Sequence, residues 1–306
     1  MYMKQTLVIG STVVDVVLNI PFIPGRGEDV NITTVDYRIG GCAHNVFMSL
    51  RLFDSPALLC SPVGSGIYGD MVRQYLEKEG IKPFVNLEAK NGCCYCLIEV
   101  DGERSFLSHH GAEYLFSRSW MESVDFSKVG SIFICGLEVE DTDGDEIVAF
   151  ACEHPELELY FAPGPRNNYV PIDRMEKLLL RRDKTGKGPF LHLNKTEAIG
   201  FSHQTTLEGA AEFLAAKTGN SVVITLGEQG CYCLAGAGLQ GRYIPPFTAN
   251  VVDTVGTGDA HYGTIIACLK SGMSLEEACM KANSIGAAVA GIQGSVLDKL
   301  PSSTDP

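Results

Sequence analysis

Two kinds of hydrophobic pattern alternate along this chain. Short apolar runs predict buried strands, and longer segments in which apolar residues recur every three or four positions predict amphipathic helices. The predicted strands are Thr6–Ile9, Ala57–Cys60, Pro83–Leu87, Ser131–Cys135, Glu158–Phe161, Phe190–Leu193 and Ser221–Leu226. The predicted helices are Ala43–Phe53, Met71–Lys78, Glu146–Glu153, Ile172–Arg181, Leu207–Ala216, Thr257–Lys270 and Ser274–Ile292. This alternation predicts a parallel sheet with helices on both faces.

Two stretches lack the helices that the rest of the pattern supplies. Residues 15–37 and 92–108 contain strand-forming segments separated by turn residues, including Asp101-Gly102. Strands without crossover helices, inserted into an α/β core, predict a small separate sheet. We interpret this sheet as a lid, formed from two discontinuous segments within a single domain that spans residues 1–306.

Composition and charge narrow the range of partners. The chain has 306 residues, and its 24 Lys and Arg against 37 Asp and Glu give a formal net charge of −13, which disfavours binding to nucleic acid or to an anionic membrane. Its longest apolar runs fall short of the roughly 18 residues that a spanning helix needs. The eleven cysteines form no Cys-x-x-Cys pair, so we expect reduced, structural thiols in a cytoplasmic protein.

The stretch from Asp253 to Asp259 carries the most specific candidate chemistry. Gly256 and Gly258 flank Thr257, and a predicted helix follows at once, beginning near Ala260. Unpaired backbone amides and the dipole at such a helix start favour an anion. This is not a Walker A loop, because no Gly-Lys-Ser/Thr follows the glycines.

Asp259 stands beside the place that a phosphate would occupy. A carboxylate near an anion is repelled by it, so its presence there indicates a function. Accepting a proton from a hydroxyl that attacks the γ-phosphorus of a nucleotide is such a function. The alternative is that Asp259 only complements the helix dipole, as acids in a first turn often do.

A second glycine-rich segment favours a different enzyme class. Residues 64–69 match the pattern G-x-G-x-x-G, follow the predicted strand Ala57–Cys60 and precede a helix, and Glu88 ends the next strand. This context is typical of a dinucleotide site in an NAD-dependent dehydrogenase. The structural alternative is a plain glycine-rich turn.

Six motifs in order resemble those of the ribokinase-like (PfkB) carbohydrate and nucleoside kinases, over nearly the whole chain. The stretch 253–259 resembles the family's C-terminal signature, and residues 40–45 resemble its Gly-Gly-x-x-x-Asn signature. The other matching segments are 63–70, 194–197, 225–230 and 282–283. The resemblance implies a three-layer α/β/α sandwich with a small β-sheet lid. It also accounts for residues 64–69 without a dinucleotide.

Carried over residue by residue, the resemblance implies a role for each matching position. Asp259 would be the catalytic base, and Gly256, Thr257 and Gly258 would form an anion hole. The implied substrate-binding residues are Asp15, Gly40, Gly41 and Asn45; the nucleotide-binding residues are Asn194, Glu197, Thr225, Gly227 and Asn283. Glu197 would organise Mg²⁺ through water, and a monovalent cation such as K⁺ would contact Asp253 and the carbonyls of Val255, Ala290 and Gly294.

Each of these positions also has an ordinary structural interpretation. Asp15 would only end a strand, Asn45 would only cap a helix, and Asn194 with Glu197 would only begin one. The sequence departs from the family pattern at Gly66, where an Asp is common, and at His261, which we expect to be a satisfied core residue.

The sequence therefore predicts an ATP- and Mg²⁺-dependent kinase that phosphorylates a primary hydroxyl of a small sugar or nucleoside. The alternatives are the dehydrogenase and a noncatalytic sugar-binding protein of the same fold. Exposed strand edges in the lid also favour a homodimer.

Overall fold

The structure is a computed structural model that describes residues 3–301. Its contacts divide the chain into two compact units. The first unit comprises the chain up to Gly10, residues Cys42–Cys60 and the chain from Phe116 onward; the second unit comprises Ser11–Gly41 and Ser61–Leu115. Each unit is described by itself.

An eight-stranded sheet forms the centre of the first unit, in the order β14-β13-β12-β11-β10-β9-β1-β4. Its strands are β1 (Gln5–Ile9), β4 (Ala57–Cys60), β9 (Val129–Cys135), β10 (Glu158–Ala162), β11 (Phe190–Asn194), β12 (Val222–Thr225), β13 (Cys231–Leu234) and β14 (Arg242–Ile244). The strands from β4 to β12 are parallel, and β13 and β14 are antiparallel. The mainly parallel sheet is confirmed, with an antiparallel edge that the sequence pattern did not show.

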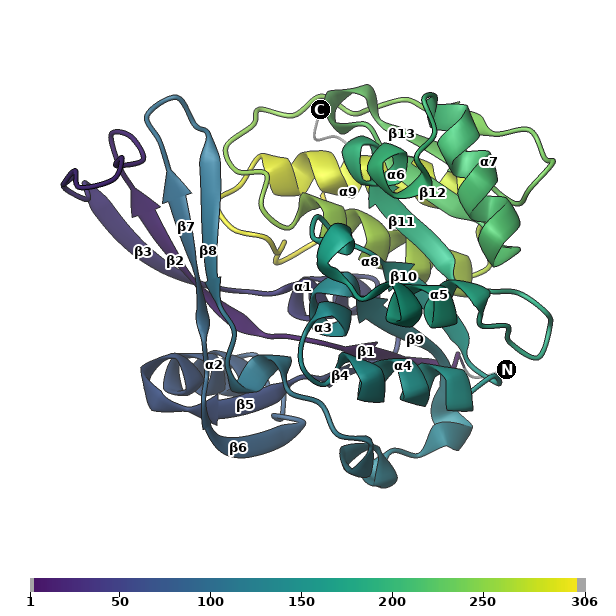
Figure 1. Ribbon diagram of the computed structural model, residues 1–306, viewed down its shortest axis with the longest axis horizontal. Helices are drawn as coiled ribbons and strands as arrows, with labels where there is room; N and C mark the ends of the chain where they lie inside the picture. Colours follow the sequence, from purple (N-terminus) through teal and green to yellow (C-terminus); the bar gives the residue numbers. More distant parts are fainter. Residues whose placement is uncertain (1–2, 302–306) are drawn as a thin grey trace. The chain divides into compact units, whose positions relative to one another are not determined.

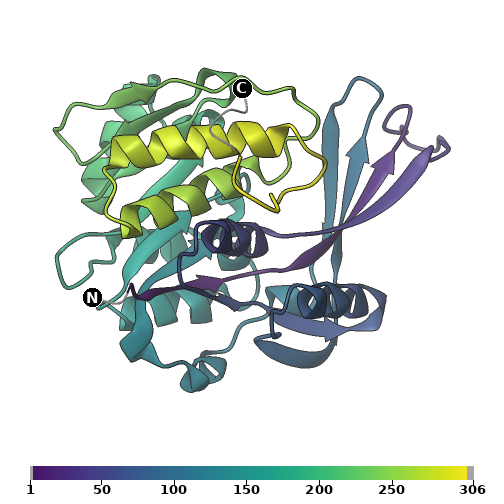
Figure 2. The same ribbon diagram turned by 180° about the vertical axis from the view of Figure 1, so that it is seen from behind.

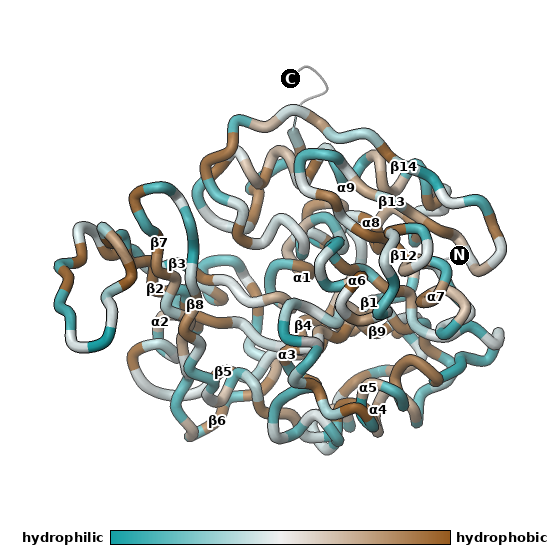
Figure 3. Tube along the Cα trace, turned by 45° about the horizontal axis from the view of Figure 1, so that its top comes forward, coloured by the Kyte–Doolittle hydropathy of each residue, from teal (hydrophilic) through white to brown (hydrophobic). Residues whose placement is uncertain are grey.

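The central strands are mostly apolar, as expected where helices cover both faces of a sheet. In β1, Leu7 and Val8 are fully buried, as are Ile132 and Phe133 in β9. Figure 3 shows the hydropathy of each residue along the chain trace. One face carries α1 (Cys42–Leu52), α8 (Thr257–Lys270) and α9 (Leu275–Ala290) (Figure 2). The other carries α3 (Gly136–Glu140), α4 (Gly144–Glu153), α5 (Ile172–Leu180), α6 (Lys195–Ser202) and α7 (Leu207–Thr218) (Figure 1). Short 3-10 helices occur at Ala112–Tyr114, Arg118–Ser123, Phe126–Lys128, Asn167–Tyr169 and Gly227–Gln229.

The second unit contains the small separate sheet that the sequence predicts. Its strands β2 (Val13–Asn19), β3 (Thr34–Gly40), β7 (Cys93–Ile98) and β8 (Arg104–His109) lie in the order β3-β2-β7-β8. Strands β2 and β7 are parallel, whereas both outer pairs are antiparallel hairpins. The same unit holds helix α2 (Gly66–Lys78) and the parallel pair β5 (Pro62–Ser65) and β6 (Val85–Lys90).

All eleven cysteines are free thiols in the structure. Most are buried, as Cys60 and Cys135 are at the ends of β4 and β9. Within residues 3–301, no cluster of His, Cys, Asp and Glu is arranged to hold a metal ion. In the same range, no helix combines the length and the apolar character needed to cross a bilayer.

Candidate active site

The start of helix α8 has no side-chain cap. Gly256 is the N-cap with φ 74°, a left-handed conformation that favours glycine, and α8 spans the predicted range Thr257–Lys270, beginning before Ala260. A Cβ at Gly256 would lie 2.2 Å from the Cβ of Ser295, whereas a Cβ at Gly258 would meet nothing within 4 Å. Because amides in a first turn lack intrahelical acceptors, this uncrowded backbone can receive an anion.

Asp259 lies in this first turn, and the pKa of its carboxyl group is shifted. Burial raises its pKa from 3.8 to about 6, and the negative charge of Glu197 acts in the same direction. Hydrogen bonds from Asn45 and from the Cys42 thiol oppose the rise by stabilising the ionised form. The Nδ2 atom of Asn45 donates to Oδ2 of Asp259 over 2.9 Å. Asp259 is therefore a carboxylate that can take a proton near neutral pH.

Asn45 reaches Asp259 from helix α1, 214 residues away in the sequence. It lies inside the helix rather than at its N-cap, so the interpretation that it only caps α1 is wrong. The hydroxyl of Ser49 donates to the backbone carbonyl of Asn45 over 2.9 Å, and that of Ser295 donates to its side-chain Oδ1 over 2.7 Å. Asn45 is buried with partners on both sides of its amide.

Within the second unit, the structure brings Asp15, Gly40 and Gly41 together. Strands β2 and β3 pair side by side, and a Cβ at Gly40 would lie 2.3 Å from Oδ2 of Asp15. Gly41 has φ 100°, and a Cβ there would lie 2.5 Å from the carbonyl oxygen of Ser11. Asp15 lies in the middle of β2, so the alternative that it only ends a strand is wrong.

Asn194 and Glu197 form a capping box at the start of α6. Oδ1 of Asn194 accepts from the amide of Glu197 over 2.8 Å, and the Glu197 carboxylate accepts from the amide of Asn194 over 3.0 Å. Burial raises the pKa of Glu197. The capping box stabilises the start of α6. Each carboxylate oxygen of Glu197 can still accept a further hydrogen bond, and the negative charge of Glu197 raises the pKa of Asp259.

Thr225 adjoins this box across the sheet. It pairs with Asn194 in the register of β11 and β12, so both residues lie at the carboxyl ends of neighbouring parallel strands. Gly227 follows with φ 61° and begins a 3-10 turn. The carboxyl edge of an open α/β sheet is where such folds bind ligands.

Asn283 is buried and fully engaged. Its Nδ2 donates to the carbonyls of Ile244 and Pro245 over 3.2 and 2.8 Å, and its Oδ1 accepts from Nε2 of His261, whose Nδ1 lies 2.9 Å from Nε2 of His192. Burial, together with the neighbouring His261, holds the pKa of His192 well below its usual range. His261 is thus the satisfied core residue that the sequence predicts.

The residues named for a monovalent cation are only partly available as ligands. Oδ1 of Asp253 accepts from the amide of Val255 over 2.9 Å. The carbonyl of Ala290 accepts from the amides of Val252 and Asp253 over 2.8 and 3.2 Å, which uses both of its lone pairs. Gly294 has φ 98°. In this conformation Ala290 does not fit a cation site.

A comparison with protein families decides the class of protein to which this site belongs. The model of the pfkB family carbohydrate kinases matches residues 3–151 and 187–302, which is most of the chain. The chain belongs to the pfkB family of carbohydrate kinases.

Relatives and solved structures agree with this assignment. The uncharacterized sugar kinase YegV of Escherichia coli strain K12 is 28% identical over 296 residues, covering 95% of this chain and 90% of the relative. The ribokinase of Mus musculus is 25% identical and covers 92% of this chain and 87% of the relative. The structure of Arabidopsis thaliana ribokinase complexed with ribose and ATP superposes with a TM-score of 0.75 at 19% identity, covering 96% and 95% of the two chains. The fold is that of the ribokinases.

This pfkB-family assignment overturns the dehydrogenase alternative, and the structure shows why the glycine pattern misled. Residues 64–69 are not a phosphate-binding loop after a strand of the central sheet. They are the end of β5 and the first turn of α2. A Cβ at Gly69 would lie 2.2 Å from the carbonyl oxygen of Gly64, so close packing requires this glycine. Gly66 begins α2 with φ 82°, a conformation that favours glycine.

Four neighbours of the site were missed in the sequence. Cys42 lowers the pKa of Asp259, Cys42 and Cys135 shift each other's pKa, and the negative charge of the buried Glu138 raises the pKa of both thiols. Ser295 binds Asn45. Cys42 lies within the glycine-rich segment 40–45, which was the available clue. Nothing in the local sequence marks the other three.

Proposed function

We propose that this pfkB-family protein transfers the γ-phosphoryl group of ATP to a primary hydroxyl of a small sugar or nucleoside. The observation that carries the proposal is the pairing of a pKa near 6 at Asp259 with the open amides of the α8 start. A carboxylate held beside an anion site by Asn45 has the geometry and proton affinity of a general base.

In the proposed reaction, the substrate oxygen attacks the γ-phosphorus while Asp259 accepts the hydroxyl proton. The new oxygen–phosphorus bond forms as the bond between the γ-phosphorus and the bridging oxygen of ADP breaks. The amides of residues 256–258 stabilise the charge on the transferring group, and the α8 dipole adds to this effect. Gly258 matters here because its missing side chain leaves the backbone uncovered.

The nucleotide side of the proposed site uses the carboxyl ends of β11 and β12. Asn194, Thr225 and Gly227 would lie along the phosphates, and Asn283 would act near the base by holding the segment Ile244–Pro245. Glu197 would hold Mg²⁺ through water, since its capping bonds leave oxygen lone pairs free. When bound, this ion neutralises phosphate charge.

Asp15, Gly40, Gly41 and Asn45 are the proposed substrate-binding residues. The solved ribokinase from Arabidopsis thaliana is a complex with ribose and ATP, which supports a small polyhydroxy substrate here. Carboxylate and amide groups suit sugar hydroxyls because they offer both acceptors and donors. We propose that the four-stranded sheet of the second unit serves as the lid that excludes water during transfer.

Two further assignments belong to this proposal. A homodimer through the lid is supported by apolar side chains on strands β3 and β8, where Tyr37 and Leu107 are 51% and 60% exposed. A monovalent cation near Asp253, Val255 and Gly294 is a weaker element, because the Ala290 carbonyl is occupied. No step of the proposed reaction depends on that ion.

Substrate-dependent release of ADP tests the proposed function. We would screen sugars and nucleosides with ATP and Mg²⁺, and run Asp259→Asn in parallel. Activity on at least one acceptor, lost in the variant, is the expected result. A clean absence of ADP release across a broad panel would favour the noncatalytic sugar-binding alternative.

A further inference from the structure

The side chain of Asn45 links Asp259 to a segment far along the chain. Its Nδ2 donates to Oδ2 of Asp259 over 2.9 Å, and its Oδ1 accepts from Oγ of Ser295 over 2.7 Å. Ser295 follows helix α9 and lies 250 residues from Asn45 in the sequence. Both residues are buried, so water does not readily replace either bond.

The chemistry of the partners fixes the direction of the amide. An ionised carboxylate only accepts hydrogen bonds, so Asn45 has to present its Nδ2 to Asp259 and its Oδ1 to the other side. There, the hydroxyl of Ser295 donates to Oδ1, and Nδ1 of His44 lies 3.2 Å from the same atom. Burial lowers the pKa of His44 to about 4, so its ring is neutral and contributes one N–H at most.

Ser295 also touches the N-cap of α8. The Cβ that Gly256 lacks would lie 2.2 Å from the Cβ of Ser295 and 3.1 Å from Nδ2 of Asn45. Ser295 is therefore packed against the backbone that begins the anion site, and its hydroxyl points into the hydrogen bond with Asn45. One small side chain contacts both parts of the proposed catalytic centre.

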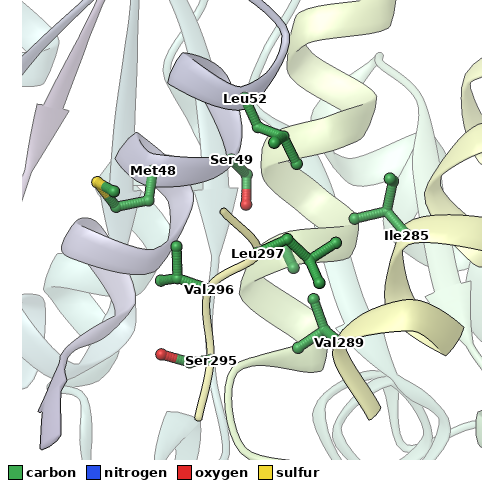
Figure 4. Close-up of a pocket in the computed structure, with 9 residues that line it drawn as sticks. Met48, Ser49, Leu52, Ile285, Val289, Ser295, Val296 and Leu297 are labelled. Atoms are coloured by element: carbon green, nitrogen blue, oxygen red, sulfur yellow. The ribbon is translucent and has the colours of Figure 1, made fainter. Parts of the chain in front are cut away.

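The surroundings of Ser295 hold it in place. A cavity of about 10 Å³ is lined by Ser49 from α1, by Ile285 and Val289 from α9, and by the segment Ser295–Leu297, as Figure 4 shows. Such a volume accommodates about one water molecule. Leu297 packs on the same apolar cluster as Ala260, the residue after Asp259. The segment after α9 is thus anchored against the helix that carries the base.

We propose that Ser295 is a positioning residue for the general base: its hydroxyl orients the amide of Asn45, which in turn keeps an N–H donor on the carboxylate of Asp259. Nothing in the sequence pattern assigns a role to Ser295. The inference rests on the proposed function, in which Asp259 takes the proton. It adds that the segment after α9 sets the proton affinity of that carboxylate.

The direct test is a titration of Asp259 in the full-length protein by ¹³C NMR of labelled aspartate carboxyls, with Asp259→Asn assigning the resonance. Ser295→Ala removes the donor, weakens the hold of Asn45 on Asp259, and raises the pKa of Asp259 by about half a unit to one unit. Ser295→Thr retains a hydroxyl and restores the wild-type value. Ser295→Cys, close in size to serine and a weaker donor, gives an intermediate rise and covers the case in which the alanine variant does not fold.

Ser49→Ala is the matched control. Ser49 is a buried serine beside the same cavity, and its hydroxyl binds the backbone of Asn45 instead of the amide. Its removal leaves the Asp259 titration unchanged. A Ser295→Ala titration that coincides with wild type, or an equal shift in Ser49→Ala, overturns the proposal.

The titration needs no substrate, so it separates this inference from the proposed function. If Ser295→Ala shifts the Asp259 titration in a protein without kinase activity, the positioning role stands and the function fails. If the protein is an active kinase and the acid limb of its kcat/KM profile is the same in Ser295→Ala and wild type, the positioning role fails and the function stands.

Discussion

Helices α8 and α9 belong to the same unit, yet their first turns are completed in different ways. At α9, Oγ of Ser274 accepts from the amide of Glu277 over 3.3 Å, and the Glu277 carboxylate accepts from the amide of Ser274 over 2.8 Å. At α8, the N-cap is Gly256, which has no side chain, and Asp259 is bound by residues of α1 instead. The α9 start is closed by its own side chains, whereas the α8 start has no side-chain cap, and its Thr257 amide donates to the carbonyl of Thr254 over 3.4 Å.

This difference distinguishes two roles that an acidic residue can have in the first turn of a helix. Glu277 and Asp259 both satisfy the usual preference for negative charge at a helix N-terminus. Only Asp259 combines that position with a pKa raised by burial and with a donor from a distant element. The bond from Asn45, rather than the helix position, therefore distinguishes Asp259 from Glu277.

The largest expected effect comes from neutralising the two acids separately. Asp259→Asn removes the proposed base and lowers kcat by about 10³-fold, while ATP binding measured by calorimetry is retained. Glu277→Gln, the corresponding change on α9, leaves kcat near the wild-type value. A near-normal rate in Asp259→Asn would remove the base from the account.

The next effect concerns the backbone of the open helix start. Gly258→Ala places a methyl group where the anion would approach, and we expect kcat/KM to fall by about tenfold or more. Folding does not suffer, because the Cβ meets nothing within 4 Å and alanine favours a helix by up to about 1 kcal/mol. Gly200→Ala in α6, also with open space around its Cβ, is the control for stability and keeps full activity. Equal activities in the two variants would argue against the anion hole.

The pH profile follows from the raised pKa of Asp259. A base works in its ionised form, so kcat/KM is expected to be flat above about pH 6 and to fall about tenfold per pH unit below it. An unshifted carboxyl, with a pKa of 3.8, would keep activity constant down to about pH 4. Steady-state rates between pH 4.5 and 8 distinguish the two profiles.

The smallest effect is expected at the closed helix start. Ser274→Ala removes half of the capping box of α9 and lowers the free energy of unfolding by about 1 kcal/mol, measured in urea. Its kcat and KM remain those of the wild type, since no amide there serves a ligand. A loss of activity at constant stability would contradict the distinction between the two helix starts.

The sequence predicted the features that depend on neighbouring residues. The apolar runs of β1 and β9 identified central strands, and the spacing of Gly256, Gly258 and Asp259 identified the start of a helix. Short elements were less predictable: β13 and β14 have four and three residues, too few to show a period. The start of α2 was placed too late because Gly66 and Gly69 suggested a turn, whereas both lie inside the helix.

The contacts that tune the site could not be read from local patterns. Asn45 and Asp259 are 214 residues apart, and only a family resemblance linked their roles. Neither Ser295 nor Glu138 lies in a recognisable motif. Ser295 follows the end of α9 and Glu138 follows the end of β9, so their positions depend on how these two elements pack in the folded chain. Tertiary packing decides such pairs, so a single sequence does not reveal them.

A crystal structure of the protein with a nonhydrolysable ATP analogue and an acceptor found by the screen would test the central claim most directly. We predict the γ-phosphate on the amides of residues 256–258 and the acceptor hydroxyl within hydrogen-bond distance of Asp259. A γ-phosphate bound elsewhere, or an acceptor hydroxyl out of reach of that carboxylate, would contradict the account.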